Sequence, residues 1–472
     1  MTTAANPKEI SYKIIIPFIV SLALFMESLD TTIINTAIPA MSRSLNVNPV
    51  DLKIALISYL LSLAIFIPIS GWVADKFGIK KVFIIAIIVF TMSSFWCGYT
   101  NNLVELIIAR SLQGLGGSQM LPVGRLIIVR TFARHELINT MTRVVMVAAL
   151  GMMLGPVLGG LITHYISWRW IFWVNIPVGL FTILMAAYWL KDSKPQTVPP
   201  LDKLGFILFG SGLAGLSFSL SAFSETGMNT TTAFIIMITA LLLLLGYVHH
   251  SHKQSNPIVN PELFRSRTFS ISIMGNLLSR LGFGGVPFLV PLLLQIAFGY
   301  SAMLSGFLLA PTALGVVLVK PFSLYILRIL GYKRLLIINT LLVGLSLWTF
   351  STISIHTSLY AIAFFTFIFG FLISLQYSGM NSLAYAEISQ ANLSSATSII
   401  STTQQLSQSF GVAMGALLIG YFTPSSSATF LLTASVFHQT FYAMGGITLL
   451  TSLLFLRLKR DDGDEMIKVP II

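Results

Sequence analysis

Long apolar stretches, separated by short polar segments, run along the chain from one end to the other. A helix of roughly 20 mostly apolar residues crosses the apolar core of a bilayer, which is about 30 Å thick. The pattern therefore predicts an all-α integral membrane protein with about 14 spanning helices. The expected spans are residues 13–39, 53–72, 81–98, 103–127, 138–162, 170–190, 204–224, 231–248, 269–297, 302–325, 334–353, 358–382, 393–422 and 433–456.

The polar segments divide these helices into two groups of about six, with a pair between them. We expect an N-terminal six-helix bundle over residues 1–190 and a second six-helix bundle over residues 269–457. Residues 191–268 would form a linker with two inserted transmembrane helices and a cytoplasmic loop, and residues 458–472 a cytoplasmic tail. The first span is too long for a secretory signal and carries acidic residues, so we expect it to remain as a helix.

Composition excludes a soluble fold. Hydrophobic residues make up 55% of the chain and charged residues only 9%, whereas soluble domains carry roughly 25% charged residues. Cys97 is the one cysteine, so a disulfide within the chain is impossible, and we expect it to be a small apolar wall residue. His249, His250 and His252 have no acid or cysteine near them in the sequence, so we expect a solvated loop and no metal site.

The formal net charge is +12, and what it indicates depends on where the Lys and Arg residues lie along the chain. If the N-terminus is cytoplasmic, the outer segments hold only Arg43, Lys53 and Arg169, and the inner segments hold roughly 20 bases. The inner bases are Lys8, Lys13, Lys76, Lys80, Lys81, Arg130, Arg134, Lys191, Lys194, Lys203, Lys253, Arg265, Arg267, Arg328, Lys333, Arg334, Arg457, Lys459, Arg460 and Lys468. The positive-inside rule then places both termini in the cytoplasm. The basic excess is a topology signal, and no nucleic acid partner is expected.

Acidic residues are almost confined to the segments between helices. Of the 16 acidic residues, only Glu27 and Asp30 fall well inside an expected span, and residues three apart share a helix face. Two carboxyl groups so close in a low-dielectric interior do not both ionise readily, so at least one is suited to taking up protons. Arg110 lies about 10 Å below the outer end of its helix, against about 14 Å for Asp30. We expect the two to pair, either for proton coupling or as a fixed ion pair that holds the bundle.

The loop between the second and third spans, residues 71–81, has the sequence GWVADKFGIKK. Glycine at 71 would permit close helix approach and glycine at 78 a tight turn, while Asp75 can pair with a base or a helix N-terminus. Such pairing would latch one conformation of the protein. The residues expected to control gating here are Gly71, Asp75, Lys76, Gly78 and Lys80.

The fifth span contains glycines four residues apart, which form a flat helix face, and a proline that permits a bend. The residues of this stripe are Gly151, Gly155, Pro156, Gly159 and Gly160. Two further motifs are RSLQG, which begins at Arg110, and LDTTIINTAIP, which begins at Leu29. A stripe of small residues is also an ordinary packing face in membrane helices.

Together these motifs resemble the signatures of the major facilitator superfamily. Residues 71–81 are similar to its G-x-x-x-D-R/K-x-G-R/K-R/K loop, and the RSLQG segment to its R-x-x-Q-G motif. The glycine stripe is similar to its antiporter motif G-x-x-x-G-P-x-x-G-G, which marks exporters. LDTTIINTAIP resembles the L-D-x-T-I-V-N-x-A-L-P signature of the 14-helix drug:proton antiporters. The resemblance implies the major facilitator fold, in which two six-helix bundles alternate access to a central cavity.

Two points within this resemblance bear on the site. Relatives more often carry an uncharged amide at the position of Glu27, which leaves the proton count and the substrate charge open. Residues 331–334, GYKR, look like a degenerate second copy of the signature loop, as a repeated fold would have. Polar residues expected at cavity depth are Asn35, Gln113, Asn276, Arg280, Gln295, Gln376 and Asn381. For Asn276, Gln295, Gln376 and Asn381, a hydrogen bond between helices is an equally good explanation.

The resemblance implies a proton-coupled exporter of drugs or other small amphiphilic compounds in the bacterial inner membrane. We expect a monomer whose partners are the lipid bilayer, protons and a small-molecule substrate. An exporter dedicated to one metabolite, such as a siderophore, amino acid or lipid, is an alternative, and a membrane sensor on a transporter scaffold is another. The sequence lacks the nucleotide-binding pattern G-x-x-x-x-G-K-S/T and the hydrolase patterns H-E-x-x-H and G-x-S-x-G. We expect no enzymatic activity and no cofactor.

Overall fold

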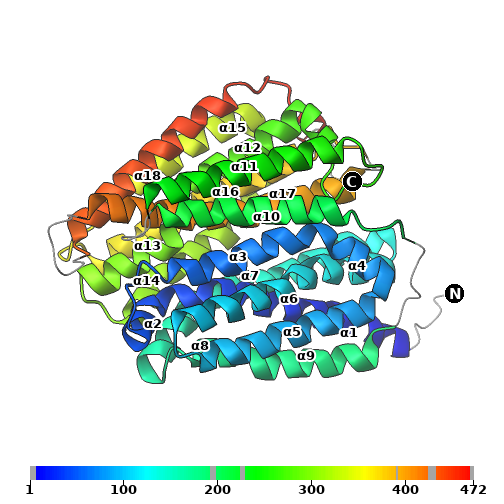
Figure 1. Ribbon diagram of the computed structural model, residues 1–472, viewed down its shortest axis with the longest axis horizontal. Coiled ribbons are helices and arrows are strands. Elements are labelled where there is room, and N and C mark those ends of the chain that lie inside the picture. Colours follow the sequence, from blue (N-terminus) through cyan, green and yellow to red (C-terminus); the bar gives the residue numbers. More distant parts are fainter. Residues whose placement is uncertain (1–6, 192–197, 224–228, 390–391, 424–431, 468–472) are drawn as a thin grey trace.

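The computed structural model describes residues 7–191, 198–223, 229–389, 392–423 and 432–467. Within these ranges the chain is helical and contains no β-strand. The helices run roughly side by side along one direction, as Figure 1 shows. Lys194 and Lys468, two of the expected inner-face bases, lie outside the described residues.

The first half of the chain forms the six expected spans, some of them broken into shorter pieces. Its elements are α1 (Pro7–Ile33), η1 (Ile34–Thr36), α2 (Ile38–Leu45), α3 (Lys53–Phe66), η2 (Ile67–Ile69), α4 (Ser70–Phe77), α5 (Ile79–Tyr99), α6 (Leu103–Thr131), α7 (Arg134–Tyr165), α8 (Trp170–Trp173) and α9 (Asn175–Trp189). Prolines account for two of the breaks, since Pro39 stands at the start of α2 and Pro68 in η2. A proline lacks the amide hydrogen that would continue the preceding helix.

The second half is broken in the same manner. Its elements are α12 (Arg267–Phe283), α13 (Val286–Leu292), η4 (Leu293–Ala297), α14 (Ala302–Leu318), α15 (Lys320–Phe350), α16 (Leu359–Ala384), α17 (Leu393–Phe422), α18 (Ala434–Phe455) and α19 (Asp464–Ile467). The expected span 302–325 ends early, because α14 and α15 meet at an angle of 57°. Pro321 lies in the first turn of α15, where it cannot continue α14. Gly331, with φ of 69°, then interrupts α15 close to the expected start of the next span.

Among the described residues, nine helices are long and apolar enough to cross a membrane, or ten if the bent pair α14 and α15 is one span. α6, α17 and α18 are also long enough, at 29, 30 and 22 residues. Polar residues interrupt their apolar sequence. The expected total of about 14 spans is reached when α6, α17 and α18 are added to the nine helices and when α14 and α15 are counted as two further spans. Polar side chains within a span normally face the protein interior rather than lipid.

The two halves lie against each other along pairs of helices. α7 packs along α14, and α3 packs along α17. In Figure 1 the first half occupies the lower part of the view, in blue and cyan, and the second half the upper part. We call the end of the molecule that carries α2 and α8 the outer end, and the end at which α1 begins the inner end.

The insert consists of α10 (Lys203–Ala222), α11 (Thr230–Ser251) and the short η3 (Pro261–Arg265). α10 packs against α11 and also contacts α3 and α17, so it lies beside both halves. The expectation of a solvated histidine loop was wrong for His250. This residue lies in the last turn of α11, and its Nε2 atom is 2.8 Å from Asp202 Oδ1. Asp202 caps the start of α10. This acid is remote in sequence, so a local pattern could not reveal it.

Two of the sequence-based expectations about glycine have opposite outcomes. Gly78 adopts φ of 91° between α4 and α5, so the expected tight turn is present. Gly331, in the second copy of the signature loop, adopts the same kind of conformation. Gly71 was expected to permit close helix approach, and that is wrong, because a Cβ atom placed there would meet nothing within 4 Å.

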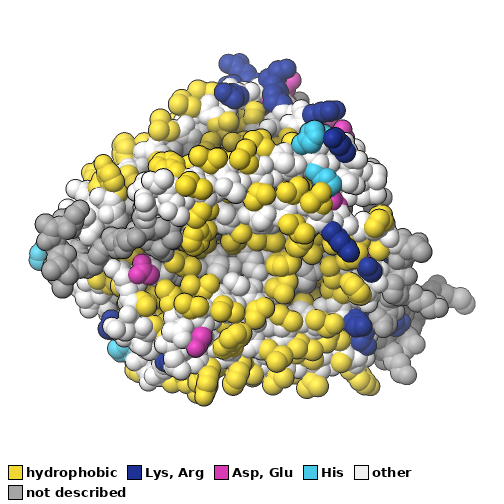
Figure 2. All heavy atoms as spheres, in the orientation of Figure 1, with side chains coloured by type: hydrophobic (Ala, Val, Ile, Leu, Met, Phe, Trp, Pro, Cys, Tyr) yellow, Lys and Arg dark blue, Asp and Glu magenta, His cyan; other side chains and the backbone are white. Residues whose placement is uncertain are grey.

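Hydrophobic side chains cover the face in Figure 2, and the Lys and Arg side chains visible on it gather mostly towards the inner end. Exposed apolar side chains on this scale are unfavourable in water and suit a lipid environment. Within α10 and α11, for example, Ile207, Leu242 and Leu245 are more than half exposed. The protein is therefore a multi-pass membrane protein.

Candidate functional site

Asp30, near the end of α1, lies at the centre of a buried polar cluster. Its Oδ2 atom accepts a 2.6 Å hydrogen bond from Arg110 Nη1 of α6, which makes an ion pair. Its Oδ1 atom accepts hydrogen bonds from Gln113 Nε2 at 2.8 Å and from Asn175 Nδ2 at 3.2 Å. The pairing expected from depth alone is present, and the cluster joins α1, α6 and α9.

Besides the Asp30 carboxylate, Arg110 contacts two aromatic rings and an amide. Its guanidinium carbon lies 4.1 Å from the centre of the Tyr59 ring and 5.8 Å from that of Phe172. Its Nη1 atom also donates to Gln113 Oε1 at 2.6 Å. A buried ion pair offsets its desolvation only when the remaining donors and acceptors are also satisfied. These contacts engage the guanidinium on its face and at Nη1.

Gln113, expected at the substrate cavity, is fully occupied within the same cluster. Besides Asp30, its Nε2 atom donates to Ser94 Oγ of α5 at 2.6 Å. Asn175 Nδ2 approaches the same hydroxyl at 3.4 Å. Both ends of the Gln113 amide are engaged and its side chain is completely buried. The Gln113 amide therefore bridges the carboxylate and the arginine.

Glu27 lies one turn before Asp30 and shares its helix face, as the spacing predicts. Its side chain is 8% exposed, and its Oε2 atom has no hydrogen-bond partner among the described residues. The charges that act on it are those of Arg125, from α6, and of Asp30. A carboxyl group with an unused oxygen can gain a proton without breaking an existing hydrogen bond. Glu27 is therefore a second candidate proton site.

The glycine stripe of α7 packs directly on α1. A Cβ atom at Gly151 would lie 2.6 Å from Phe25 O. Cβ atoms at Gly155 and Gly159 would collide with Thr32 and with the Ile33 carbonyl oxygen, respectively. Only glycine allows this separation of the two helices. The stripe thus holds α7 against the helix that carries both candidate proton sites.

The last glycine of the stripe reaches the other half. A Cβ atom at Gly160 would collide with the carbonyl oxygen of Ala302 in α14, and one at Gly306 with that of Pro156 in α7. The two helices therefore touch backbone to backbone at their outer ends. Gln295, expected at the cavity, instead joins the halves here, and its Nε2 atom donates to Thr36 O at 2.9 Å.

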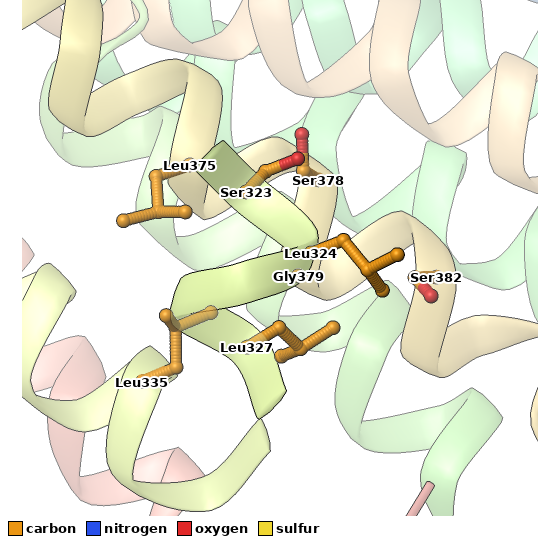
Figure 3. Close-up of a pocket in the computed structure, with 8 residues that line it drawn as sticks. All are labelled: Ser323, Leu324, Leu327, Leu335, Leu375, Ser378, Gly379 and Ser382. Atoms are coloured by element: carbon orange, nitrogen blue, oxygen red, sulfur yellow. The ribbon is translucent and has the colours of Figure 1, made fainter. Parts of the chain in front are cut away.

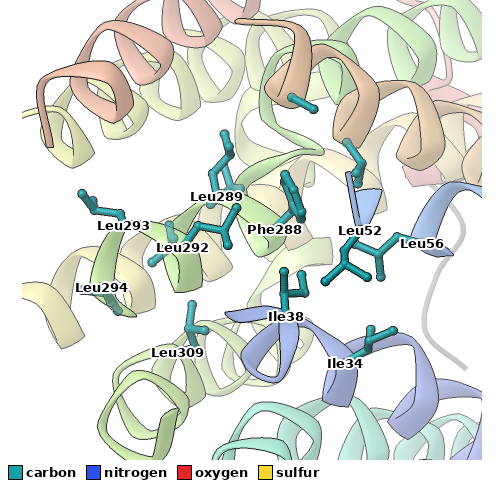
Figure 4. Close-up of a cluster of buried hydrophobic side chains, with 14 of the residues drawn as sticks. Ile34, Ile38, Leu52, Leu56, Phe288, Leu289, Leu292, Leu293, Leu294 and Leu309 are labelled. Carbon is teal, nitrogen blue, oxygen red and sulfur yellow. The ribbon is translucent and has the colours of Figure 1, made fainter. Parts of the chain in front are cut away.

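A hydrophobic cluster closes the same end. Figure 4 shows Ile34, Ile38 and Leu52 of the first half facing Phe288 and Leu289 of the second. All five are less than 5% exposed. Asn35, another cavity candidate, lies in the sequence between Ile34 and Ile38 and is 8% exposed. In this structure the outer side of the protein is closed.

The signature loop, residues 71–81, contacts neighbouring helices at the inner end. Asp75 Oδ1 accepts a 2.5 Å hydrogen bond from Arg130 Nη2 of α6, so it pairs with a base as expected. Lys80 Nζ donates to Ala187 O of α9 at 2.7 Å. Lys76 Nζ lies 4.5 Å from the Trp72 ring. These contacts hold α4, α5, α6 and α9 together as one unit.

Most polar candidates of the second half bind other helices. Asn339 Nδ2 of α15 donates to Gln376 Oε1 of α16 at 2.8 Å, and Gln376 Nε2 donates to Thr340 Oγ1 at 2.8 Å. Asn381 Oδ1 accepts from Gln404 Nε2 of α17 at 2.9 Å. For Gln376 and Asn381, therefore, the alternative of a hydrogen bond between helices is the one that the structure displays.

Arg280 of α12 differs from these residues, because part of its side chain has no hydrogen-bond partner. Its guanidinium carbon lies 3.9 Å from the centre of the Tyr377 ring, and its Nη1 atom donates to Gln408 Oε1 at 3.3 Å. Its Nε atom has no partner, and no carboxylate of the described residues forms an ion pair with it. Asn276 lies one turn earlier, donates to Ser272 O at 3.2 Å, and leaves its Oδ1 atom without a partner.

A pocket at the inner end is too small for a drug-sized substrate. It lies between α15 and α16, and its 140 Å³ compare with roughly 300–1,000 Å³ for small-molecule sites. Figure 3 shows the residues that line it, which are Ser323, Leu324, Leu327, Leu335, Leu375, Ser378, Gly379 and Ser382. The candidate residues of the polar cluster and Arg280 are not among them.

Several residues of the site were not found from the sequence. These are Tyr59, Ser94, Asn175 and Gln408, all common residue types. Only the fold brings Tyr59 and Gln408 to the two arginines, and Asn175 and Ser94 to Asp30 and Gln113. Arg125 did carry a signal, because it is a charge within the expected span 103–127.

Two packed groups of membrane helices with tight backbone contact between them are the organisation of a membrane transport protein. The chain belongs to the Major Facilitator Superfamily, whose family model matches residues 20–412 and, in a second match, residues 273–469. Its second half is thus also matched on its own.

Curated relatives are similar to this chain over almost its whole length. A protein of Escherichia coli O6:H1 (strain CFT073) named "Putative multidrug resistance protein MdtD" is 36% identical over 447 residues, which cover 94% of each chain. The protein of the same name from Pectobacterium atrosepticum is 36% identical over 445 residues, which cover 94% of this chain and 95% of the relative. The expected membership of the major facilitator superfamily is thereby confirmed, and the likeness to relatives named MdtD covers 94% of this chain.

Solved structures confirm the fold. The crystal structure of the POT family transporter PepTSo superimposes with a TM-score of 0.69 at 15% identity, covering 96% of this chain and 98% of that one. The tetrameric PepTSo2 structure superimposes with a TM-score of 0.68 at 16% identity, covering 94% and 97%. At such identity the likeness concerns the fold alone.

Proposed function

We propose that the protein is a proton-coupled exporter of small amphiphilic compounds in the bacterial inner membrane. The observation that carries the proposal is the ion pair of Asp30 and Arg110, which is closed off from solvent. A proton on Asp30 cancels the charge that holds Arg110, so proton binding changes the forces between α1 and α6. The names of the relatives, which refer to multidrug resistance, support export.

The cycle follows from this pair. In the outward-facing state Asp30 takes a proton and releases Arg110, and in the inward-facing state deprotonation restores the pair. The structure combines a closed outer side with a formed ion pair, which suits the step after proton release. Glu27 supplies a second proton site in the same helix.

Substrate access alternates by rocking of the halves. We propose that residues 1–190 and 269–457 move as units about α7–α14 and α3–α17, while residues 191–268 accompany them. The backbone contacts of Gly160 and Gly306 then separate when the outer side opens. Asp75, Lys76, Gly78 and Lys80 hold the inner end of the first unit, so the movement of one helix is passed to its neighbours.

We propose the orientation with both termini in the cytoplasm. In it, the inner end that carries the signature loop and the bases Lys333, Arg334 and Arg460 faces the cytoplasm. Protons then enter from the outer side, down their gradient, and substrate leaves towards it.

The test is transport by the purified protein in liposomes with an imposed pH gradient. Proton movement triggered by cationic, neutral and anionic amphiphiles is followed with an internal pH dye. For wild type we expect proton release linked to at least one compound, and for Asp30→Asn its loss. Equal signals in the two proteins would contradict the assignment of Asp30.

Folding of the variant must be checked in parallel, because a purely structural ion pair would make Asp30→Asn unstable rather than inactive. Size-exclusion profiles and thermal unfolding in detergent separate these cases. A wild-type response to a single endogenous metabolite would favour a dedicated exporter. No response to any compound would favour a sensor.

A further inference from the structure

The charges well inside the spans do not balance. Asp30 is paired with Arg110, and the charge of Arg125 acts on Glu27. Arg280 is the additional charge, and among the described residues it has no carboxylate partner. A buried arginine without a counter-ion is costly in a membrane protein. Its presence therefore calls for a negative group from outside the chain.

The surroundings of Arg280 contact the cation but leave one of its donors unused. Its side chain is 9% exposed, with Tyr377 on the face of the guanidinium and Gln408 on Nη1. The Nε atom remains a buried donor without a partner. An arginine offers a planar fork of donors that matches a carboxylate or a phosphate. The unused edge of this fork is the feature that points to an anion.

Further aromatic rings pack beside Tyr377, the ring that lies on the face of the guanidinium. The rings of Phe283 and Tyr377 lie 5.7 Å apart at 48°, and that of Phe369 lies 6.4 Å from Phe283. Such side chains offer an apolar wall beside the cation, which suits a ligand with both a charged and an apolar part.

The acids of the first half are poorly placed to receive a cationic substrate. Asp30 is completely buried, and both of its oxygens are used by Arg110, Gln113 and Asn175. Glu27 has a free oxygen, but the positive charge of Arg125 acts on it. Arg143, near the inner end of α7, is exposed and needs no buried partner.

We propose that Arg280 binds the anionic group of the substrate, an inference that rests on the proposed export function. The exporter then carries amphiphilic organic anions, or zwitterions with a carboxylate-like group, in preference to simple cations. Asn276, one turn earlier with a free Oδ1 atom, accepts a hydrogen bond from the same ligand.

The test compares matched probes on the full-length protein in detergent. Each probe set shares one aromatic skeleton, naphthalene for example, and carries a carboxylate, a carboxamide or an aminomethyl group. Equilibrium binding is measured for wild type, Arg280→Gln, Arg280→Lys and the control Arg457→Gln, whose exposed arginine lies beyond α18.

We expect the carboxylate to bind wild type most tightly. Arg280→Gln should weaken it at least about 30-fold, because the ligand charge then stays unpaired in a buried site. The carboxamide should change less than about 10-fold, since a neutral group loses at most one hydrogen bond. The affinity of Arg280→Lys for the carboxylate should lie between those of wild type and Arg280→Gln, because lysine keeps the charge but lacks the planar set of donors. Arg457→Gln should behave as wild type.

In the binding experiment, three results would overturn the inference: no carboxylate bound by wild type, equal affinity for all three probes, or the same loss for carboxamide and carboxylate in Arg280→Gln. The last result would indicate a structural arginine. Proton flux in liposomes separates the two proposals. Flux with cations only leaves the exporter standing and rejects the anion site, whereas carboxylate binding without any flux supports the site and rejects the exporter.

Discussion

Arg110 Nη1 and Asp30 Oδ2 lie 2.6 Å apart, and the two side chains are only 1% and 0% exposed. Removal of one partner from such a pair is strongly destabilising, because it leaves a buried charge uncompensated. Replacement of both partners is milder. This asymmetry allows the charge of the pair to be separated from its packing by experiment.

Arg110→Gln should reduce the free energy of unfolding by about 3–5 kcal/mol, since Asp30 then keeps a buried charge without a partner. Asp30→Asn combined with Arg110→Gln should recover much of that loss. Asp30→Asn alone, which resembles the protonated acid, should be tolerated better than Arg110→Gln. Unfolding in detergent, by heat or denaturant, measures all four proteins. Equal instability of the single and the double variant would mean that the arginine acts through its packing on Tyr59.

The sequence reveals the helices better than their breaks. Hydrophobic stretches of span length predict where each helix lies, because a bilayer demands that length. The 57° bend between α14 and α15 was not predicted, although Pro321 marks it. A proline at a helix start is compatible with several geometries, and the packing of the helix then selects one.

The site was predictable in its charged members and in Gln113, which belongs to the motif that begins at Arg110. Asp30 and Arg110 stand out because charges are rare in spans, and depth along the helix correctly suggested their pairing. Asn175 and Ser94 carry no such signal, since amides and hydroxyls also occur in ordinary helix contacts. The same ambiguity explains Gln295 and Gln376, whose hydrogen bonds join helices. Gly71 matched a motif, but its surroundings are open.

The outer closure can be opened by one methyl-bearing side chain. Gly160→Val should force α7 away from the Ala302 carbonyl oxygen and shift the protein to the outward-open state. In a background without Cys97, labelling of Asn35→Cys by a membrane-impermeant thiol reagent added from outside should rise about 10-fold, because each 1.4 kcal/mol changes a population tenfold. Gly246→Val in α11 is the control, since nothing lies within 4 Å of a Cβ atom there. Labelling that does not differ between the two variants would argue against closure at this contact.

The signature loop should control the rate of the cycle rather than binding. Asp75→Asn removes the charge from its contact with Arg130, and both side chains are about one third exposed, so the loss of stability should stay below about 1 kcal/mol. We expect substrate affinity within 2-fold of wild type and transport reduced about 10-fold, because the four tied helices no longer move together. Binding in detergent and flux in liposomes give the two values. A parallel loss of both would place Asp75 in general folding.

Glu27 decides how many protons accompany each substrate molecule. Glu27→Gln keeps the shape of the side chain and removes its capacity for a proton, while the Asp30–Arg110 pair stays intact. If both acids carry protons, the variant should still transport, with one proton fewer per substrate, as the pH gradient at which flux reverses would reveal. Glu105→Gln is the matched control, because that acid lies partly exposed in the first turn of α6, where its Oε2 atom accepts from the Asn101 backbone amide. An unchanged reversal point in Glu27→Gln would leave Asp30 as the single coupling site. Complete loss of flux in a folded Glu27→Gln protein would instead make Glu27 the obligatory one, with Asp30 as the group that positions Arg110.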